Sequence, residues 1–113
     1  MGSFETRDDE SDAFLRPLRV AVRREYVYSE AKNMVADLEC WTLVSAVDGE
    51  FVLHCERRAG FLGSRARITI GVQGPEGIPS ATVIVRSETT GSLFTRDKAN
   101  VREFMEPFSR RVG

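Results

Sequence analysis

The fold is decided by the stretch WTLVSAVDGEFVLHCERR, which occupies residues 41–58. Asp48-Gly49 divides this stretch into two runs that are rich in β-branched and aromatic residues. An Asp-Gly pair between two such runs is a strong signal for a β-hairpin with a two-residue turn. We therefore predict two antiparallel strands, over residues 41–47 and 50–58.

The register of this hairpin assigns residues to its two faces. A two-residue turn pairs Val47 with Glu50 and places one nearly apolar face beneath the helices. That face holds Cys40, Thr42, Val44, Ala46, Phe51, Leu53 and Cys55. The opposite face should meet water, although it carries large apolar side chains. On it we place a candidate interaction face, which consists of Trp41, Leu43, Val52 and His54.

A partly apolar outer face indicates a partner, most simply a second copy of this chain. We therefore predict a homodimer or a complex with another protein. Two simpler explanations stay open. Scattered apolar residues are common on sheets, and a β-bulge in either strand would exchange the two faces.

The sequence on either side of the hairpin supplies the remaining elements. Alternating polar and apolar residues predict strands, and apolar residues at helical spacing predict helices. The predicted strands are 18–27, 65–73 and 81–88. The predicted helices are 30–39, with Ser29 as its N-cap, and a final helix that begins at Thr95 or Asp97 and ends at Val112. Pro107 should kink that helix or split it near Met105, because proline lacks an N–H donor.

The predicted order is β-α-β-β-β-β-α. It indicates an α+β fold in which an antiparallel sheet of about five strands carries both helices on one face. A chain of 113 residues has room for one domain, which we place at residues 17–113. Residues 1–16 are predicted to be an acidic, disordered tail, because residues 1–12 hold five acidic side chains and one arginine.

Composition excludes several classes of protein. The formal net charge is −1, so we do not expect the protein to bind nucleic acid. No apolar run is long enough for a membrane-spanning helix, and no secretory signal opens the chain, so we expect a cytoplasmic protein. In that compartment Cys40 and Cys55 should be buried free thiols, with a disulfide between them as the alternative.

The residues that carry chemistry are few. The glycines form no phosphate-binding pattern, and no spacing of cysteine, histidine and acidic residues matches a metal site. We therefore predict no catalytic residue, no cofactor and no metal. A small enzyme that uses His54, the single histidine, is kept as a second alternative.

Two glycine-flanked segments, at residues 60–63 and 91–94, place bulky apolar residues where loops are expected. If both lie at one end of the sheet, they form an apolar lip beside arginines. This candidate ligand lip consists of Phe61, Leu62, Leu93, Phe94, Arg65 and Arg96. It would suit an anionic or lipidic ligand, while the simpler alternative is that the lip closes the core beneath the second helix.

Several arginines of the strands can share the outer sheet face. They are Arg19, Arg23, Arg65 and Arg67. A cluster of this kind can bind an anionic ligand, but acidic residues on neighbouring strands can also neutralise it. We expect such pairing, with Glu25, Glu56 and Glu88 as the acidic partners.

Several features of residues 18–112 form a further pattern. They are the strand and helix of Val20–Ala31, the hairpin after Trp41, the link Gly60-Phe61-Leu62-Gly63, the run Val85-Arg86-Ser87-Glu88-Thr89-Thr90-Gly91, and a helix with Asn100, Val101, Arg102 and Phe104. This pattern resembles a bacterial family catalogued as domain of unknown function 1499. In that family a serine-rich strand and a glycine precede an aspartate–glycine–asparagine helix start. Here Asp97 and Asn100 are present without the glycine between them, and Ser64 and Arg65 replace an acidic pair.

The resemblance implies no site residues, because the family has none assigned. The order of elements, with its final helix, also resembles the lipid-binding kinase-associated domain 1. The function favoured by all these observations is a small non-catalytic binding or interaction domain that associates with itself through the outer sheet face.

Overall fold

The computed structural model describes residues 2–58, 65–90 and 96–113. Along these residues the elements are β1 (Gly2–Glu5), η1 (Ala13–Leu15), β2 (Leu18–Val20), α1 (Arg24–Asp37), β3 (Trp41–Val47), η2 (Asp48–Glu50), β4 (Val52–Arg58), β5 (Arg65–Gln73), β6 (Ala81–Thr90) and α2 (Asp97–Val112). The elements η1 and η2 are short 3₁₀ helices.

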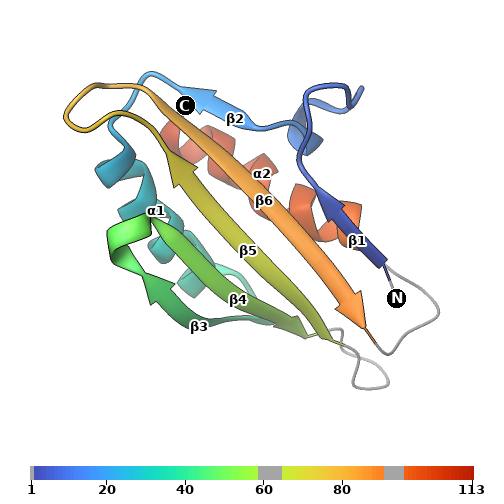
Figure 1. The fold of residues 1–113 in the computed structure, drawn as a ribbon. Helices are drawn as coiled ribbons and strands as arrows, with labels where there is room; N and C mark the ends of the chain where they lie inside the picture. Colours follow the sequence, from blue (N-terminus) through green and yellow to red (C-terminus); the bar gives the residue numbers. More distant parts are fainter. Residues whose placement is uncertain (1, 59–64, 91–95) are drawn as a thin grey trace.

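The described strands form one antiparallel sheet, and both α-helices lie on the same face of it (Figure 1). The strand order is β1-β6-β5-β4-β3, and β2 pairs with β6 beyond the end of β1. The predicted α+β class and the placement of both helices on one face are confirmed. The described part of the sheet has six strands instead of about five, because residues 2–5 add a strand.

The core lies between the sheet and α2. Side chains alternate along β5, so that every second residue from Ala66 to Val72 is buried against the helices. The predicted apolar stripe of α2 is confirmed, since Val101, Phe104, Phe108 and Val112 are all buried. The rings of Phe104 and Phe108 lie 4.7 Å apart at their centroids. Aromatic and branched side chains therefore fill the space between α2 and the sheet.

The first helix begins earlier than its sequence pattern predicted. The expected strand 18–27 ends at Val20, and α1 begins at Arg24 instead of residue 30. Val27 and Tyr28 are buried with Ala31, which extends the apolar stripe one turn toward the N-terminus. Ser29 therefore lies inside the helix instead of capping it.

The second helix runs from Asp97 to Val112 with Pro107 inside it, so the predicted split near Met105 is wrong. Met105 and Phe108, on either side of the proline, are both buried. Their burial stabilises the helix across the position where one backbone hydrogen bond is missing.

The hairpin pairs β3 with β4, but its turn is longer than two residues. The turn η2 is followed by Phe51 in the left-handed conformation, with φ 57°, so Val47 pairs with Val52 instead of Glu50. The register then shifts at Val44, because Leu43 pairs with Cys55 and Ser45 with His54. The predicted faces are therefore correct on β4 and wrong on the first half of β3.

The N-terminal segment is docked on the domain, which corrects the predicted disordered tail. In β1, Phe4 pairs with Ser87 of β6 and is only 7% exposed. Thr6 extends this contact, since its hydroxyl accepts a hydrogen bond of 3.2 Å from the Val85 amide. Three acidic residues of the segment form ion pairs with the rest of the chain: Asp8 with Arg19, Glu10 with Lys98, and Asp12 with Arg102.

Docking of this segment predicts a measurable contribution to stability. Phe4→Ala should lower the free energy of unfolding by about 3 kcal/mol, because it leaves a cavity between β1 and α2. Urea unfolding monitored by tryptophan fluorescence would measure the change. Ile78→Ala is the control, since Ile78 is 53% exposed and should change stability little. An unchanged midpoint for Phe4→Ala would show that the segment does not pack on the domain.

Both cysteines are free, but they are not both buried as predicted. Cys40 is exposed immediately before β3, and Cys55 is buried in β4. Burial raises the pKa of the Cys55 thiol to about 12. Cys55 therefore holds almost no thiolate, the reactive form, at neutral pH.

We accordingly expect only one thiol to react in the folded protein. An aromatic disulfide reagent at pH 8 should modify Cys40 rapidly and Cys55 only as the protein unfolds. Cys40→Ser should remove the fast phase and leave the slow one. Rapid modification of two thiols in the native wild-type protein would contradict the buried position of Cys55.

Candidate functional site

The candidate site is the end of the sheet where β4 ends, β5 begins and β6 ends. Arg58, Arg65 and Thr90 lie in one cross-strand row there. The strand ends that flank residues 59–64 and 91–95 are therefore neighbours. Of the predicted ligand lip, Phe61, Leu62, Leu93 and Phe94 lie outside the described residues, while Arg65 and Arg96 lie within them.

Three exposed arginines gather on the helix-free face at this end. Arg58 stands directly opposite Arg65, and Arg67 follows Arg65 on the same face of β5. Like charges directly opposite in an antiparallel pair destabilise it. Glu56 lies 3.5 Å from Arg65, which confirms the predicted pairing for that arginine. Within residues 2–58, 65–90 and 96–113, no carboxylate lies within 4.0 Å of Arg58 or Arg67.

Shallow hollows separate these arginines. One of about 220 Å³ is lined by Glu56, Arg65, Ala66, Arg67, Glu88 and Thr90. Another of about 160 Å³ lies between Arg58 and Arg65 and reaches Cys40. Both hollows open on the surface, so a guanidinium group at either can reach an anionic group from solvent.

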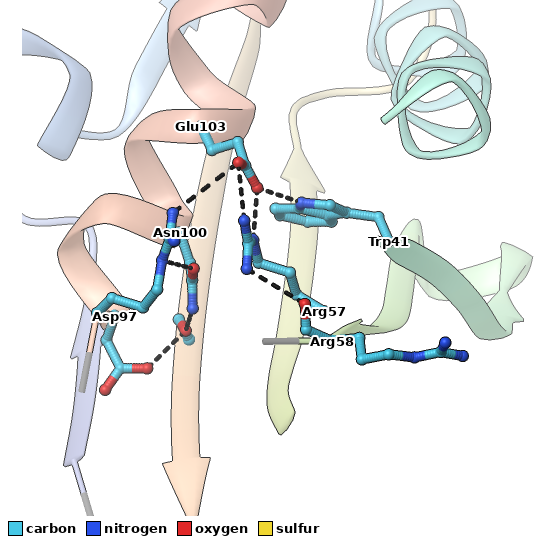
Figure 2. A network of polar contacts seen from close by, with 8 residues as sticks. Trp41, Arg57, Arg58, Asp97, Asn100 and Glu103 are labelled. Carbon is cyan, nitrogen blue, oxygen red and sulfur yellow. Dashed lines mark hydrogen bonds and ion pairs between the residues drawn. The ribbon is translucent and has the colours of Figure 1, made fainter. Parts of the chain in front are cut away.

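Behind this face, an ion-pair cluster joins β3, β4 and α2 (Figure 2). Glu103 accepts hydrogen bonds from the Trp41 indole at 2.5 Å and from Arg57 Nε at 2.6 Å. Burial would raise the pKa of the Glu103 carboxyl, but the bonds from Arg57 and Trp41 hold that pKa below its ordinary value. Arg58 points away from this cluster in Figure 2, so two consecutive arginines have opposite environments.

A second buried cluster fixes the start of α2 on β6. The Asp97 Oδ1 atom accepts hydrogen bonds from Ser87 at 2.6 Å and from Thr89 at 2.7 Å. Asn100 donates to Ser87, and Asn100 Oδ1 accepts from Arg96 Nε at 3.1 Å. The other carboxylate oxygen of Asp97 is buried and has no hydrogen-bond partner among residues 2–58, 65–90 and 96–113. The two clusters anchor α2 to three strands and thereby hold this end of the sheet in place.

Sequence reasoning did not identify these polar clusters, although one signal was present. Ser87 and Thr89 occupy the alternating positions of β6 that face the helices, where Val83 and Val85 stand earlier in the strand. A polar residue at a core position needs a buried partner. A helix with a polar first turn, such as that of Asp97 and Asn100, is a natural source of one.

The structure does not bring the predicted interaction face together. Trp41 is 7% exposed and packs on Phe104 beneath α2, with ring centroids 6.0 Å apart. Leu43 lies on the same side of the sheet, because it pairs with the buried Cys55. Val52 and His54 lie on the opposite side, and no side-chain hydrogen bond or ion pair joins the His54 imidazole to another described residue.

A larger groove lies between β1 and the start of α2. It has a volume of about 860 Å³ and is lined by Gly2–Arg7 and Arg96–Ala99. Each of its cations already has a carboxylate within 4.0 Å: Glu10 lies 2.9 Å from Arg7 and 3.6 Å from Lys98, and Glu103 lies 3.9 Å from Arg96. This groove is therefore less suited to an anion than the arginine cluster on the sheet.

The described ranges contain neither a metal-ligand group nor a membrane-spanning helix. Among residues 2–58, 65–90 and 96–113, no three histidine, cysteine or acidic side chains are grouped as metal ligands. In the same part of the chain, neither helix has the length and apolar character needed to cross a bilayer.

The ion-pair cluster predicts a pH-dependent contribution to stability. Glu103→Gln should lower the free energy of unfolding at pH 7 by about 2 kcal/mol, because it weakens charge-assisted hydrogen bonds. The pKa of Glu103 is lower in the folded state, so its contribution is present above the ordinary glutamate pKa and is lost as the pH falls through the folded-state value. Urea unfolding at several pH values should show the difference from wild type shrinking in acid. Glu76→Gln in the exposed β5–β6 turn is the control, and a difference that grows in acid would contradict this assignment.

Comparison with known proteins identifies the fold alone. No protein-family model and no curated protein matches the chain. Among solved structures, the chain is similar to the crystal structure of Ara h 8.0201, with a TM-score of 0.53 and 10% sequence identity. The alignment covers 98% of this chain and 94% of that chain. At this identity the similarity extends to the arrangement of helices and strands, not to any site.

Proposed function

We propose that the protein is a small non-catalytic binding domain that takes an anionic group at the arginine-rich end of its sheet. The observation that carries this proposal is the cross-strand pair of Arg58 and Arg65, with Arg67 beside them. Placing like charges opposite each other costs stability, and a bound anion would offset that cost.

The chemistry of the side chains favours phosphate or carboxylate as the bound group. A guanidinium presents a planar fork of donors that matches these oxygens, and it stays charged at any physiological pH. Arg58 and Arg67 are exposed, and within the described ranges no carboxylate lies within 4.0 Å of either guanidinium. Glu56 and Glu88 flank Arg67 on the neighbouring strands and offset part of its charge, so Arg58 is the less compensated of the two. Phe61, Leu62, Leu93 and Phe94 adjoin this end in sequence, so the anionic headgroup of a lipid is one source of the group.

Two alternatives have less support. An enzyme based on His54 would need a polar partner that hydrogen-bonds to the imidazole, and the His54 side chain makes no hydrogen bond or ion pair among the described residues. A ligand buried between α2 and the sheet would have to displace Phe104 and Phe108, whose side chains are wholly buried there.

The resemblance to domain of unknown function 1499 and the cytoplasmic location are likewise proposals. Asp97 and Asn100, which carry the resemblance, both contact Ser87 of the preceding run, as residues of one shared structural element should. Free Cys40 and Cys55 are compatible with a reducing compartment.

Anion binding predicts a charge-specific loss of affinity. The wild-type protein should float with vesicles of phosphatidylserine and phosphatidylcholine but not with phosphatidylcholine alone. Arg58→Gln/Arg67→Gln should weaken this binding about thirtyfold, at about 1 kcal/mol per arginine. Arg23→Gln/Arg110→Gln removes the same charge elsewhere and serves as the matched control.

A titration with inorganic phosphate, followed by amide NMR, distinguishes a free anion from a lipid surface. Shifts confined to residues 56–58 and 65–67 without flotation would indicate a soluble anionic ligand. If neither probe binds at low salt, or if both double variants lose binding equally, the proposal is wrong.

A further inference from the structure

The third strand forms an open edge of the sheet. β3 pairs with β4 on one side, and no described strand pairs with it on the other (Figure 1). At the opposite edge, β6 is covered by both β1 and β2. The seven residues of β3 therefore present alternate N–H and C=O groups outward, which is the template for adding another strand.

This edge lacks most of the features that prevent strands from pairing. Trp41–Val47 contains no charged residue and no proline. Leu43, Val44 and Val47 are 40%, 58% and 37% exposed, and they account for three of the five exposed large apolar side chains in the described residues. The register shift at Val44 is the one protective device present. An edge of this kind is typical of a surface that is covered in the functional state.

We propose that a second copy of this chain pairs with β3 in antiparallel orientation, about a two-fold axis at Val44. Antiparallel pairing of one strand with itself is self-complementary, so it closes as a dimer and leaves no further edge at the interface. Val44 of each copy then faces Val44 of the other, and Trp41 lies opposite Val47. The two sheets join into one continuous sheet with α1 and α2 of both copies on the same face.

The charges at the two ends of β3 favour this orientation. Arg58 lies at the first end, where its amide donates a hydrogen bond of 2.8 Å to the Cys40 carbonyl. Glu50 lies in the turn at the second end. Among the described residues, neither Arg58 nor Glu50 has a group of opposite charge within 4.0 Å. Antiparallel pairing brings Arg58 of one copy toward Glu50 of the other, twice, whereas parallel pairing brings like charges together.

This interface goes beyond the anion site, because it rests on the backbone edge and the apolar side chains of β3. Arg58 takes part in both the proposed anion site and the proposed dimer interface. The primary test therefore uses Val44, which belongs to the dimer interface alone. Val44→Lys adds a buried like-charge pair at the axis without changing any arginine. Ile78→Lys is the matched control, because Ile78 is 53% exposed in the turn at the far end of β5.

Sedimentation velocity from about 1 µM to about 1 mM protein covers the range of weak interfaces. The mass should rise from the chain mass of 12.7 kDa toward twice that value. Val44→Lys should raise the dissociation constant at least tenfold, and Ile78→Lys should not. Hydrogen exchange of the β3 amides should slow with protein concentration in the wild type, and circular dichroism should show both variants folded.

The orientation has its own test. Glu50→Arg should weaken the dimer, and the double variant Glu50→Arg/Arg58→Glu should restore it. A mass of 12.7 kDa across the whole concentration range would overturn the proposal. The proposal would be equally wrong if β3 paired only with an extended peptide of another protein, because the chain alone would then stay at that mass. A dimer unaffected by Val44→Lys would also overturn it, because another surface would then form the contact. Loss of anion binding in a protein that still dimerises would leave this interface standing.

Discussion

The contact of Trp41 with α2 is the constraint on which much of this structure depends. The indole packs on Phe104 and donates to Glu103, so it combines apolar burial with a buried polar bond. This anchor decides which side of β3 faces the helices, and it holds Glu103 where Arg57 can reach it. Arg57 is thereby neutralised behind the sheet, while Arg58, the next residue, is left on the open side at the edge of the arginine cluster.

Strands β3 to β6 and the final helix could be predicted from the sequence because each carries a periodic pattern of its own, whereas β1 was missed and the predicted strand 18–27 runs into α1. β5 and the buried stripe of α2 are the clearest cases. The hairpin was predicted correctly as a hairpin, but its register could not be. Register depends on the conformation of Phe51 and on the shift at Val44, and neither has a local sequence signal as strong as Asp48-Gly49. A change of one residue in pairing moves a side chain across the sheet, which is why Trp41 was placed on the wrong face.

The acidic N-terminal segment shows a different limit of sequence reasoning. Its charge indicated disorder, because a run of like charges usually stays solvated. The remainder of the chain, however, carries an excess of three positive charges, and Asp8, Glu10 and Asp12 each meet one of its basic residues. Phe4 and Thr6 supply the buried contacts that the ion pairs alone would not provide. Charge asymmetry between two parts of one chain can therefore indicate docking as well as disorder.

The polar clusters and the arginine pair belong to one physical arrangement. Asp97, Asn100 and Glu103 lie on the face of α2 that meets the sheet, and each uses a side chain of β3, β4 or β6 as its partner. Buried polar contacts of this kind are directional, so they fix the position of α2 along the strands more sharply than apolar packing does. A fixed end of the sheet keeps Arg58 opposite Arg65 despite their repulsion. Rigid presentation of like charges is the condition under which several arginines converge on one anion, because the ligand then binds without first having to order them.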